Sequence, residues 1–218
     1  MGQLSDIVEC MSLCFVAWGF FYLGLHRRGV GYVRYYWATT LYFLFFAGLI
    51  AVLFESQIFW AFEQFSAVPL IVAAVFMAAQ TAFYILLPRY LPDQKAYLTA
   101  HPDRYYLEVN WRRLISKSAD IFAQQVFIIV LVVSLHAMGL SLVQLVGWFF
   151  VLFSLLHIPL IATEWGRWPS WVFAGAVVSF SIVFPPLILL IPYGFVYTFV
   201  LHWIFYTVMA VVFWIQYE

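Results

Sequence analysis

Residues 143–163 read VQLVGWFFVLFSLLHIPLIAT and contain no Asp, Glu, Lys or Arg. A helix needs about 20 mostly apolar residues to cross the hydrocarbon core of a bilayer, and this stretch has that length and composition. The rest of the chain agrees with it, because 66% of the 218 residues are hydrophobic and only 9% are charged. A soluble domain carries about 25% charged residues. The sequence therefore predicts an all-α polytopic membrane protein.

Further apolar stretches of similar length predict a bundle of about seven membrane-spanning helices. The expected spans cover residues 8–25, 33–54, 67–88, 120–138, 143–163, 170–190 and 194–215. Pro185 and Pro186 predict a kink or an early stop near the outer end of the sixth span. The Pro and Gly of residues 191–194 predict a tight hairpin after it. The N-terminal residues lack the cationic region of a cleavable signal peptide, so we expect the first span to stay in the mature protein.

The basic residues predict the orientation of the chain in the membrane. All ten fall in or beside the first, third and fifth connections: Arg27, Arg28, Arg34, Arg89, Lys95, Arg104, Arg112, Arg113, Lys117 and Arg167. Basic residues favour the cytoplasmic side of a membrane protein, so the N-terminus is expected outside and the C-terminus in the cytoplasm. Ten acidic residues balance the ten basic ones, so net charge does not indicate a nucleic-acid partner, and none is expected.

Residues 89–119 form a long polar connection in this pattern. Leu107, Trp111 and Leu114 recur at the spacing of one helical face, with basic residues around the rest of the helix. The pattern is typical of a short interfacial helix on the inner leaflet, and a solvated loop with ordinary basic residues is the alternative. The expected organisation is then three N-terminal spans (1–88), this inner connection (89–119) and a four-helix C-terminal part (120–218).

Polar side chains gather in spans four, five and seven, where burial in hydrocarbon is costly. They are Asp120, Gln124 and Gln125 in span four, His157 in span five, and His202 and Tyr206 in span seven. Residues four apart share a helical face, which pairs Asp120 with Gln124 and His202 with Tyr206. Gln124 and His157 are about 6 Å and about 9 Å from the inner ends of their expected spans. We therefore expect this amide and this imidazole to share an enclosed pocket.

Three of these segments resemble the motifs of the CPBP (Abi) family of intramembrane glutamic proteases, which includes the type II CAAX prenyl endopeptidases. The segments are Asp120-Ile-Phe-Ala-Gln124-Gln125, Phe153-Ser-Leu-Leu-His157 and His202-Trp-Ile-Phe-Tyr206. The family motifs are a Glu-Glu pair followed by Arg, then Phe-x-x-x-His, then His-x-x-x-Asn, in the same order on separate spans. The resemblance covers about residues 115–215, and it implies that spans four to seven are arranged like the CPBP protease core.

The chain departs from the family pattern at the catalytic positions. Gln124 and Gln125 stand where the family has its paired glutamates, and Tyr206 replaces the usual Asn. In the family the glutamate and the first histidine are thought to activate water, and a neutral carboxamide is too weak a base for that step. Asp120 is a candidate replacement base one turn away; the alternatives are that it caps the span or pairs with Lys117. The resemblance therefore implies the fold more strongly than the activity.

The expected function is that of a catalytically impaired CPBP-like membrane protein, acting as a scaffold, an accessory subunit or a modulator of a membrane partner. One alternative is an active intramembrane CAAX-type endopeptidase, or one inactivated by an engineered Glu→Gln change. Another is a purely structural subunit of a larger membrane complex, since hydrogen bonds between buried amides and imidazoles also join helices without chemistry. The expected partners are membrane lipids and a membrane protein or a membrane-embedded peptide.

No cofactor or metal is expected. Cys10 and Cys14 share a helical face, but no matching His or Cys accompanies them, so they are expected to be packing residues. Haem ligation by His157 and His202 is disfavoured, because His202 lies about 20 Å from the inner end of its expected span, deeper than His157.

Overall fold

The computed structural model describes residues 2–63, 66–90, 99–100, 108–163 and 168–215 of the chain, which are helical with no strand among them. Six helices in these ranges are long and apolar enough to cross a bilayer. Another helix is apolar over the shorter stretch Leu142–Ile158. The protein is therefore an all-α polytopic membrane protein, as predicted.

The helices are α1 (Gly2–Phe20), α2 (Tyr36–Leu53), α3 (Glu55–Phe62), α4 (Ala67–Leu86), α6 (Trp111–Ala137), α7 (Leu142–Thr163), α8 (Trp168–Leu190) and α9 (Gly194–Ile215). A π-helical turn η1 (Phe21–Leu25) and a 3-10 turn η2 (His26–Arg28) continue α1, and a 3-10 turn η3 (Leu87–Arg89) continues α4. Gly29 at φ 84° and Gly139 at φ 75° follow the ends of η2 and α6, in the left-handed conformation that glycine adopts without strain. Each predicted span overlaps one of these helices, and six of the helices are long and apolar enough to cross a bilayer.

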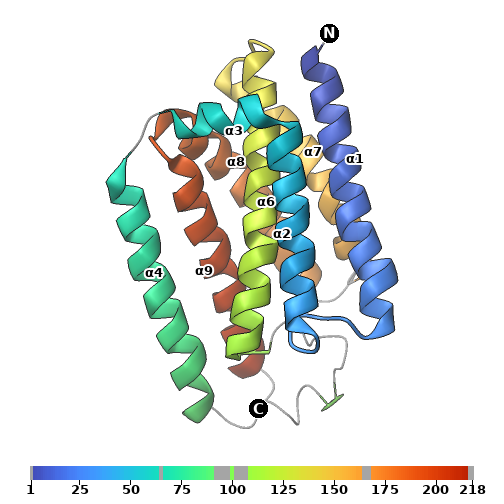
Figure 1. Cartoon of the computed structure of the whole chain (residues 1–218), viewed down its shortest axis with the longest axis vertical. Helices are drawn as coiled ribbons and strands as arrows, with labels where there is room; N and C mark the ends of the chain where they lie inside the picture. Colours follow the sequence, from blue (N-terminus) through green and yellow to red (C-terminus); the bar gives the residue numbers. More distant parts are fainter. Residues whose placement is uncertain (1, 64–65, 91–98, 101–107, 164–167, 216–218) are drawn as a thin grey trace.

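Helix α6 lies at the centre of the bundle (Figure 1). It contacts α1, α2, α3, α4, α7, α8 and α9. The cause is the apolar run from Val126 to Val133, whose residues are all buried. A helix that is apolar on every side is stable only when other helices surround it.

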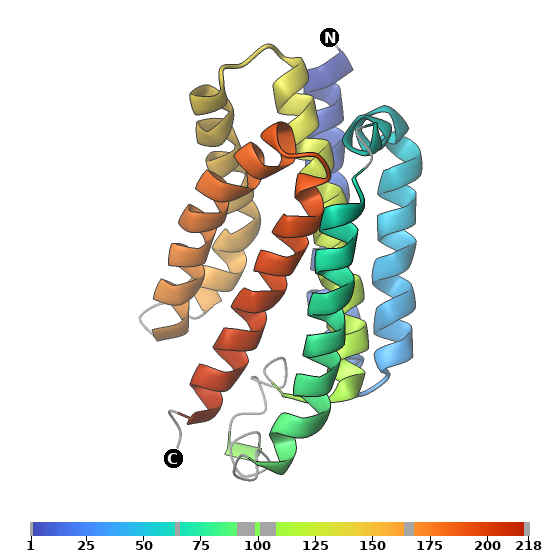
Figure 2. The same ribbon diagram turned by 90° about the vertical axis from the view of Figure 1, so that its left-hand side faces the viewer.

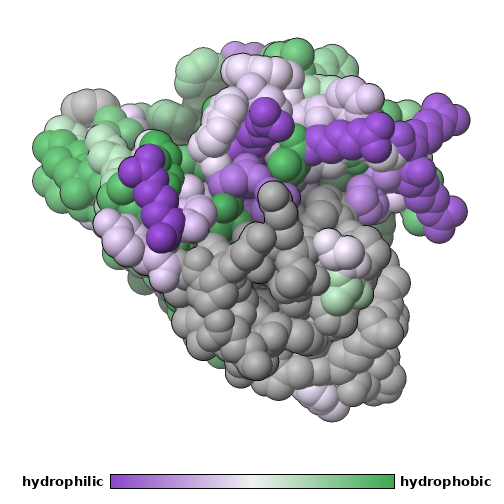
Figure 3. Space-filling model, turned by 90° about the horizontal axis from the view of Figure 1, so that it is seen from below, coloured by the Kyte–Doolittle hydropathy of each residue, from purple (hydrophilic) through white to green (hydrophobic). Residues whose placement is uncertain are grey.

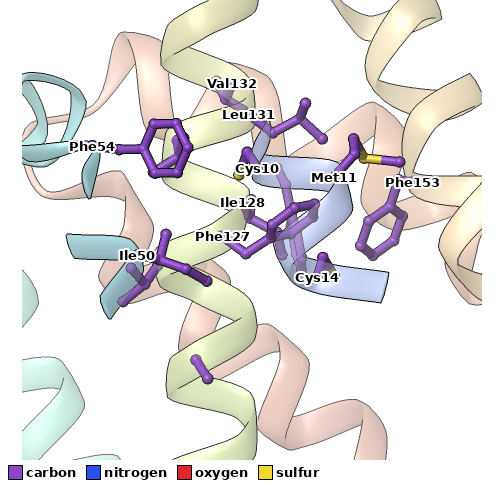
Figure 4. Close-up of a cluster of buried hydrophobic side chains, with 14 of the residues drawn as sticks. Cys10, Met11, Cys14, Ile50, Phe54, Phe127, Ile128, Leu131, Val132 and Phe153 are labelled. Carbon is purple, nitrogen blue, oxygen red and sulfur yellow. The ribbon is translucent and has the colours of Figure 1, made fainter. Parts of the chain in front are cut away.

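The main hydrophobic core joins α6 to α1, α2 and α7 (Figure 4). Phe127, Ile128 and Leu131 of α6 point into it. Cys10 and Cys14 of α1 are buried there as free thiols, which is the packing role predicted for them. This core fixes α6 against the N-terminal helices and thereby positions the polar residues on its lower half.

Alternating helix directions bring η2, η3 and the start of α6, with their basic residues, to one end of the bundle (Figures 1 and 2). The N-terminus and the connections α2–α4, α6–α7 and α8–α9 lie at the opposite end (Figures 1 and 2). Hydrophilic side chains gather on the basic end, which Figure 3 views directly. Lys95, Arg104 and Arg167 lie outside the described residues.

Helix α6 begins nine residues before the predicted start of span four, at Trp111. Trp111 and Leu114 therefore belong to the spanning helix, and the predicted separate interfacial helix is wrong for these positions; Leu107 lies outside the described residues. Asn110 caps the helix, because its side chain accepts a hydrogen bond from the Arg113 backbone N–H at 3.0 Å. The early start is possible because the basic side chains that follow find buried partners.

The prolines of α8 do not stop the helix, which continues to Leu190. Of the two predicted outcomes, a kink or an early stop, the early stop is wrong, and Figure 2 shows the last turns of α8 leaning toward the start of α9. Phe184 and Ile188 are buried on either side of the proline pair, and this packing holds the helix together where two backbone donors are missing. The predicted hairpin follows, closed by the Gly194 N–H donating to the Ile191 carbonyl at 2.8 Å.

Candidate functional site

The carboxylate of Asp120 is the centre of a buried polar network on α6. Its Oδ1 accepts hydrogen bonds from Trp18 Nε1 at 3.0 Å and from Gln124 Nε2 at 2.9 Å. Its Oδ2 accepts from the Tyr32 hydroxyl at 2.7 Å and from Lys117 Nζ at 2.6 Å. A carboxylate offers about four lone-pair sites, and these four donors occupy them. The side chain of Asp120 therefore has no acceptor left for a substrate or a catalytic water.

Lys117 is the counter-ion of Asp120, and both side chains are buried, at 4% and 0% exposure. Its ammonium also lies 3.8 Å from the centre of the Tyr206 ring on α9 and 5.0 Å from that of Tyr32. A cation over an aromatic face is attracted by the negative charge density of the ring. Lys117 thus connects the α6 network to α9. Pairing with Lys117 was one of the three roles that the sequence allowed for Asp120.

The second half of the network joins Gln125 to α9. Gln125 Nε2 lies 3.1 Å from His202 Nδ1, and Gln125 Oε1 accepts from the Thr198 hydroxyl at 2.6 Å. The His202 ring stacks on Tyr206, with 5.3 Å between centroids and 18° between planes. Because an amide nitrogen donates, His202 Nδ1 accepts, and a neutral His202 carries its proton on Nε2.

His157 on α7 makes a different contact. Its Nδ1 lies 2.8 Å from the Phe153 carbonyl, and its ring packs on that of Phe153 at 4.4 Å. Since a carbonyl only accepts, Nδ1 carries the proton. Gln124 was expected to share an enclosed pocket with His157; its amide donates to Asp120, and no described hydrogen bond joins it to His157.

Five of the six predicted site residues therefore form one connected chain, and no described contact joins His157 to it. In order, the chain runs Gln124, Asp120, Lys117, Tyr206, His202, Gln125 and Thr198. We call it the α6–α9 polar chain. Sequence reasoning missed Trp18 and Tyr32, which come from 102 and 88 residues before Asp120 and carry no local signal.

A second polar cluster, also missed, attaches α4 to the bundle. Arg113 of α6 is fully buried, and its Nη1 donates to the Tyr84 hydroxyl at 3.4 Å. One turn earlier on α4, Gln80 Oε1 accepts from the Thr207 hydroxyl at 3.2 Å. Arg113 had been expected on the inner surface, because positive charge usually marks a solvated connection.

Within the part of the chain that the structure describes, no three His, Cys, Asp or Glu side chains converge on a position that could hold a metal ion. The α6–α9 polar chain contains one carboxylate, and that carboxylate is saturated by its donors. Its remaining members are amides, hydroxyls, imidazole and ammonium. This composition suits hydrogen bonding between helices or to a bound group better than proton abstraction.

Comparison of the chain with models of protein families, with curated proteins and with solved structures found no match. The likeness to the CPBP motifs is a likeness of three short segments.

Proposed function

We propose that this chain is a CPBP-like membrane protein that binds a membrane partner without hydrolysing it, as a scaffold, an accessory subunit or a modulator. The observation that carries the proposal is the 3.1 Å contact between Gln125 and His202. These residues occupy the first and third motif positions of the resemblance. Their meeting across α6 and α9 brings two of the three motif segments together, and the group that meets the imidazole is an amide.

The chemistry of the amide supports a loss of catalysis. A glutamate in this place could take a proton from water, whereas Gln125 offers its N–H to His202 and its oxygen to Thr198. Asp120 does not replace the glutamate, because the pair with Lys117 holds it as a structural anion. A hydrolytic water would therefore have no free carboxylate beside it in the α6–α9 polar chain, and the Nδ1 lone pair of His202 is taken by the Gln125 amide.

Cleavage assays on the purified, membrane-reconstituted chain test the proposal. Prenylated CAAX peptides and transmembrane peptides should stay intact. The matched comparison is Gln125→Glu, which restores a carboxylate beside His202; any activity it gains should disappear on adding His157→Ala. Cleavage by the unaltered chain that is lost in His157→Ala would refute the proposal in favour of an active endopeptidase.

The proposed binding role also predicts how the chain behaves with its membrane partner. A scaffold or accessory subunit should co-purify from its native membrane with one membrane protein or membrane-embedded peptide at a fixed stoichiometry. Gln125→Leu together with His202→Phe changes the polar chain and leaves the outward faces of the helices intact. Loss of the partner in this variant places the contact at the polar chain, and retention places it on an outer face.

We also propose that the N-terminus faces outward and the C-terminus faces the cytoplasm. Arg27 and Arg28 in η2 and Arg89 in η3 all lie at the end of the bundle that carries the C-terminus. Cytoplasmic connections are enriched in such residues. A reporter that fluoresces only in the cytoplasm should be bright when fused to the C-terminus; a bright N-terminal fusion and a dark C-terminal one would invert the topology.

A further inference from the structure

Arg113, on the first turn of α6, is a buried cation that the α6–α9 polar chain does not use. Its side chain has 0% exposure. Nη1 donates to the Glu108 carbonyl at 3.0 Å and to the Tyr84 hydroxyl at 3.4 Å. Among the described residues, Nε and Nη2 have no hydrogen-bond partner. The guanidinium therefore keeps two buried donor nitrogens unpaired.

The two unpaired nitrogens share one edge of the planar guanidinium. The N–H of Nε and one N–H of Nη2 point in the same direction, and this edge binds two oxygens of a carboxylate or a phosphate at once. The nearby acids have other partners. Asp120 pairs with Lys117, and the Glu108 carboxylate accepts from the Asn110 amide. Glu108 interacts with Arg113 electrostatically, but no described hydrogen bond joins its carboxylate to the free edge, so an anion bound at this edge would lower the cost of burying the guanidinium.

Trp203 of α9 provides a second, independent sign of a missing acceptor. Its indole is fully buried, and Nε1 lacks a hydrogen-bond partner in the described part of the chain. The Trp203 ring packs edge-on against Tyr84, with 5.7 Å between centroids. Tyr84 thus contacts both Arg113 and Trp203. The unpaired atoms around this tyrosine are N–H donors, which an oxyanion satisfies and a cation or an apolar ligand does not.

We propose that Arg113 binds a phosphate group, as the headgroup of a membrane phospholipid or as free phosphate. The position favours this anion, because Arg113 lies at the basic end of a membrane-spanning helix, where lipid phosphates gather. Helix α4 is the element that can admit it. Among its residues only Pro69, Gln80 and Tyr84 are buried, so α4 is held to the bundle along a narrow stripe.

The test uses the purified full-length chain in detergent and follows its thermal unfolding. The probes are phosphatidylglycerol, diacylglycerol with the same acyl chains, and inorganic phosphate. Phosphatidylglycerol or phosphate should raise the unfolding temperature, and diacylglycerol should not. Half-saturation should weaken at least about tenfold in Arg113→Gln and in Arg113→Lys, since lysine keeps the charge but not the two-nitrogen edge.

Arg112→Gln is the matched control, because it removes the same charge from the adjacent, exposed position. It should bind like the unaltered chain. A response to phosphatidylglycerol alone assigns the site to a lipid headgroup, and a response to inorganic phosphate assigns it to the free anion. The proposal is overturned if neither probe binds, if Arg113→Lys binds normally, or if Arg112→Gln loses as much affinity. Because Arg113→Lys keeps the buried charge, the outcome does not depend on whether Arg113→Gln folds.

Discussion

The Lys117–Asp120 pair makes the sharpest prediction for stability. Both side chains are buried and 2.6 Å apart. Replacing Lys117 with Met keeps a long unbranched side chain but leaves the Asp120 charge without its counter-ion. Breaking a buried ion pair on one side costs about 3–5 kcal/mol. Asp120 would retain three neutral donors, from Trp18, Tyr32 and Gln124, which places the loss near the lower end, at about 3 kcal/mol.

The cation–π contact with Tyr206 adds to this loss. The ammonium lies 3.8 Å from the ring centre, in a buried position where such a contact is worth about 2 kcal/mol. Lys117→Met should therefore lower the free energy of unfolding by about 5 kcal/mol in total. Unfolding in mixed micelles by titration with SDS, followed by tryptophan fluorescence, measures this change. Arg28→Met is the matched control, since it removes an exposed basic residue and should change stability by about 0.5 kcal/mol or less.

A double-mutant cycle separates the ion pair from simple packing. Asp120→Asn alone should also destabilise, because it leaves Lys117 buried and unpaired. The double variant buries neither charge and should lose less than the sum of the two single changes by at least about 2 kcal/mol. Additive losses, within about 0.5 kcal/mol, would show that the two groups do not act as a pair and would refute the reasoning.

Two further predictions use the same unfolding measurement. Glu108 precedes α6, and burial raises its pKa above the ordinary value of 4.5, against the opposing effects of the Asn110 hydrogen bond and Arg113. An acid whose pKa is raised in the folded state stabilises the fold less as the pH rises. Its contribution is greatest below pH 4.5 and declines through the raised pKa, and Glu108→Gln should remove this slope; an unchanged slope would exclude Glu108 as its source. Ile128 is fully buried in the main core, so Ile128→Ala should cost about 2–5 kcal/mol, whereas Phe122→Ala on the exposed side of α6 should cost about 0.5 kcal/mol. Equal losses at the two positions would mean that α6 is not the centre of the bundle.

The number and order of the long helices could be predicted because hydrocarbon imposes a length on each apolar run. The predicted span 143–163 starts one residue after α7 and ends with it at Thr163. The start of α6 could not be predicted in this way. Arg113 and Lys117 read as solvated charge, and only their hydrogen-bond partners make burial possible. Those partners are Tyr84, on another helix, and Asp120 with its own donors.

The direct partners of the site residues were predictable only where they share a helix. Asp120 with Gln124 and with Lys117 follow from spacings of four and three residues. The contacts of Asp120 with Trp18 and Tyr32 join segments that no local pattern links. Helix periodicity fixes which face a residue occupies, but it does not say which other helix that face will meet.

The revised start of α6 also removes a difficulty in the depth of the polar residues. Counted from an expected span start at residue 120, Gln125 would lie about 8 Å from the inner end, and His202 at about 20 Å would be too deep to meet it. Counted from Trp111, Gln125 lies about 21 Å along α6, and His202 lies about 20 Å from the end of α9 at Ile215. The two side chains therefore stand at the same level, as their 3.1 Å contact requires. Because Arg113 and Lys117 are buried, α6 extends further at its inner end than their charge suggests. The same two residues therefore determine the depth at which Gln125 meets His202.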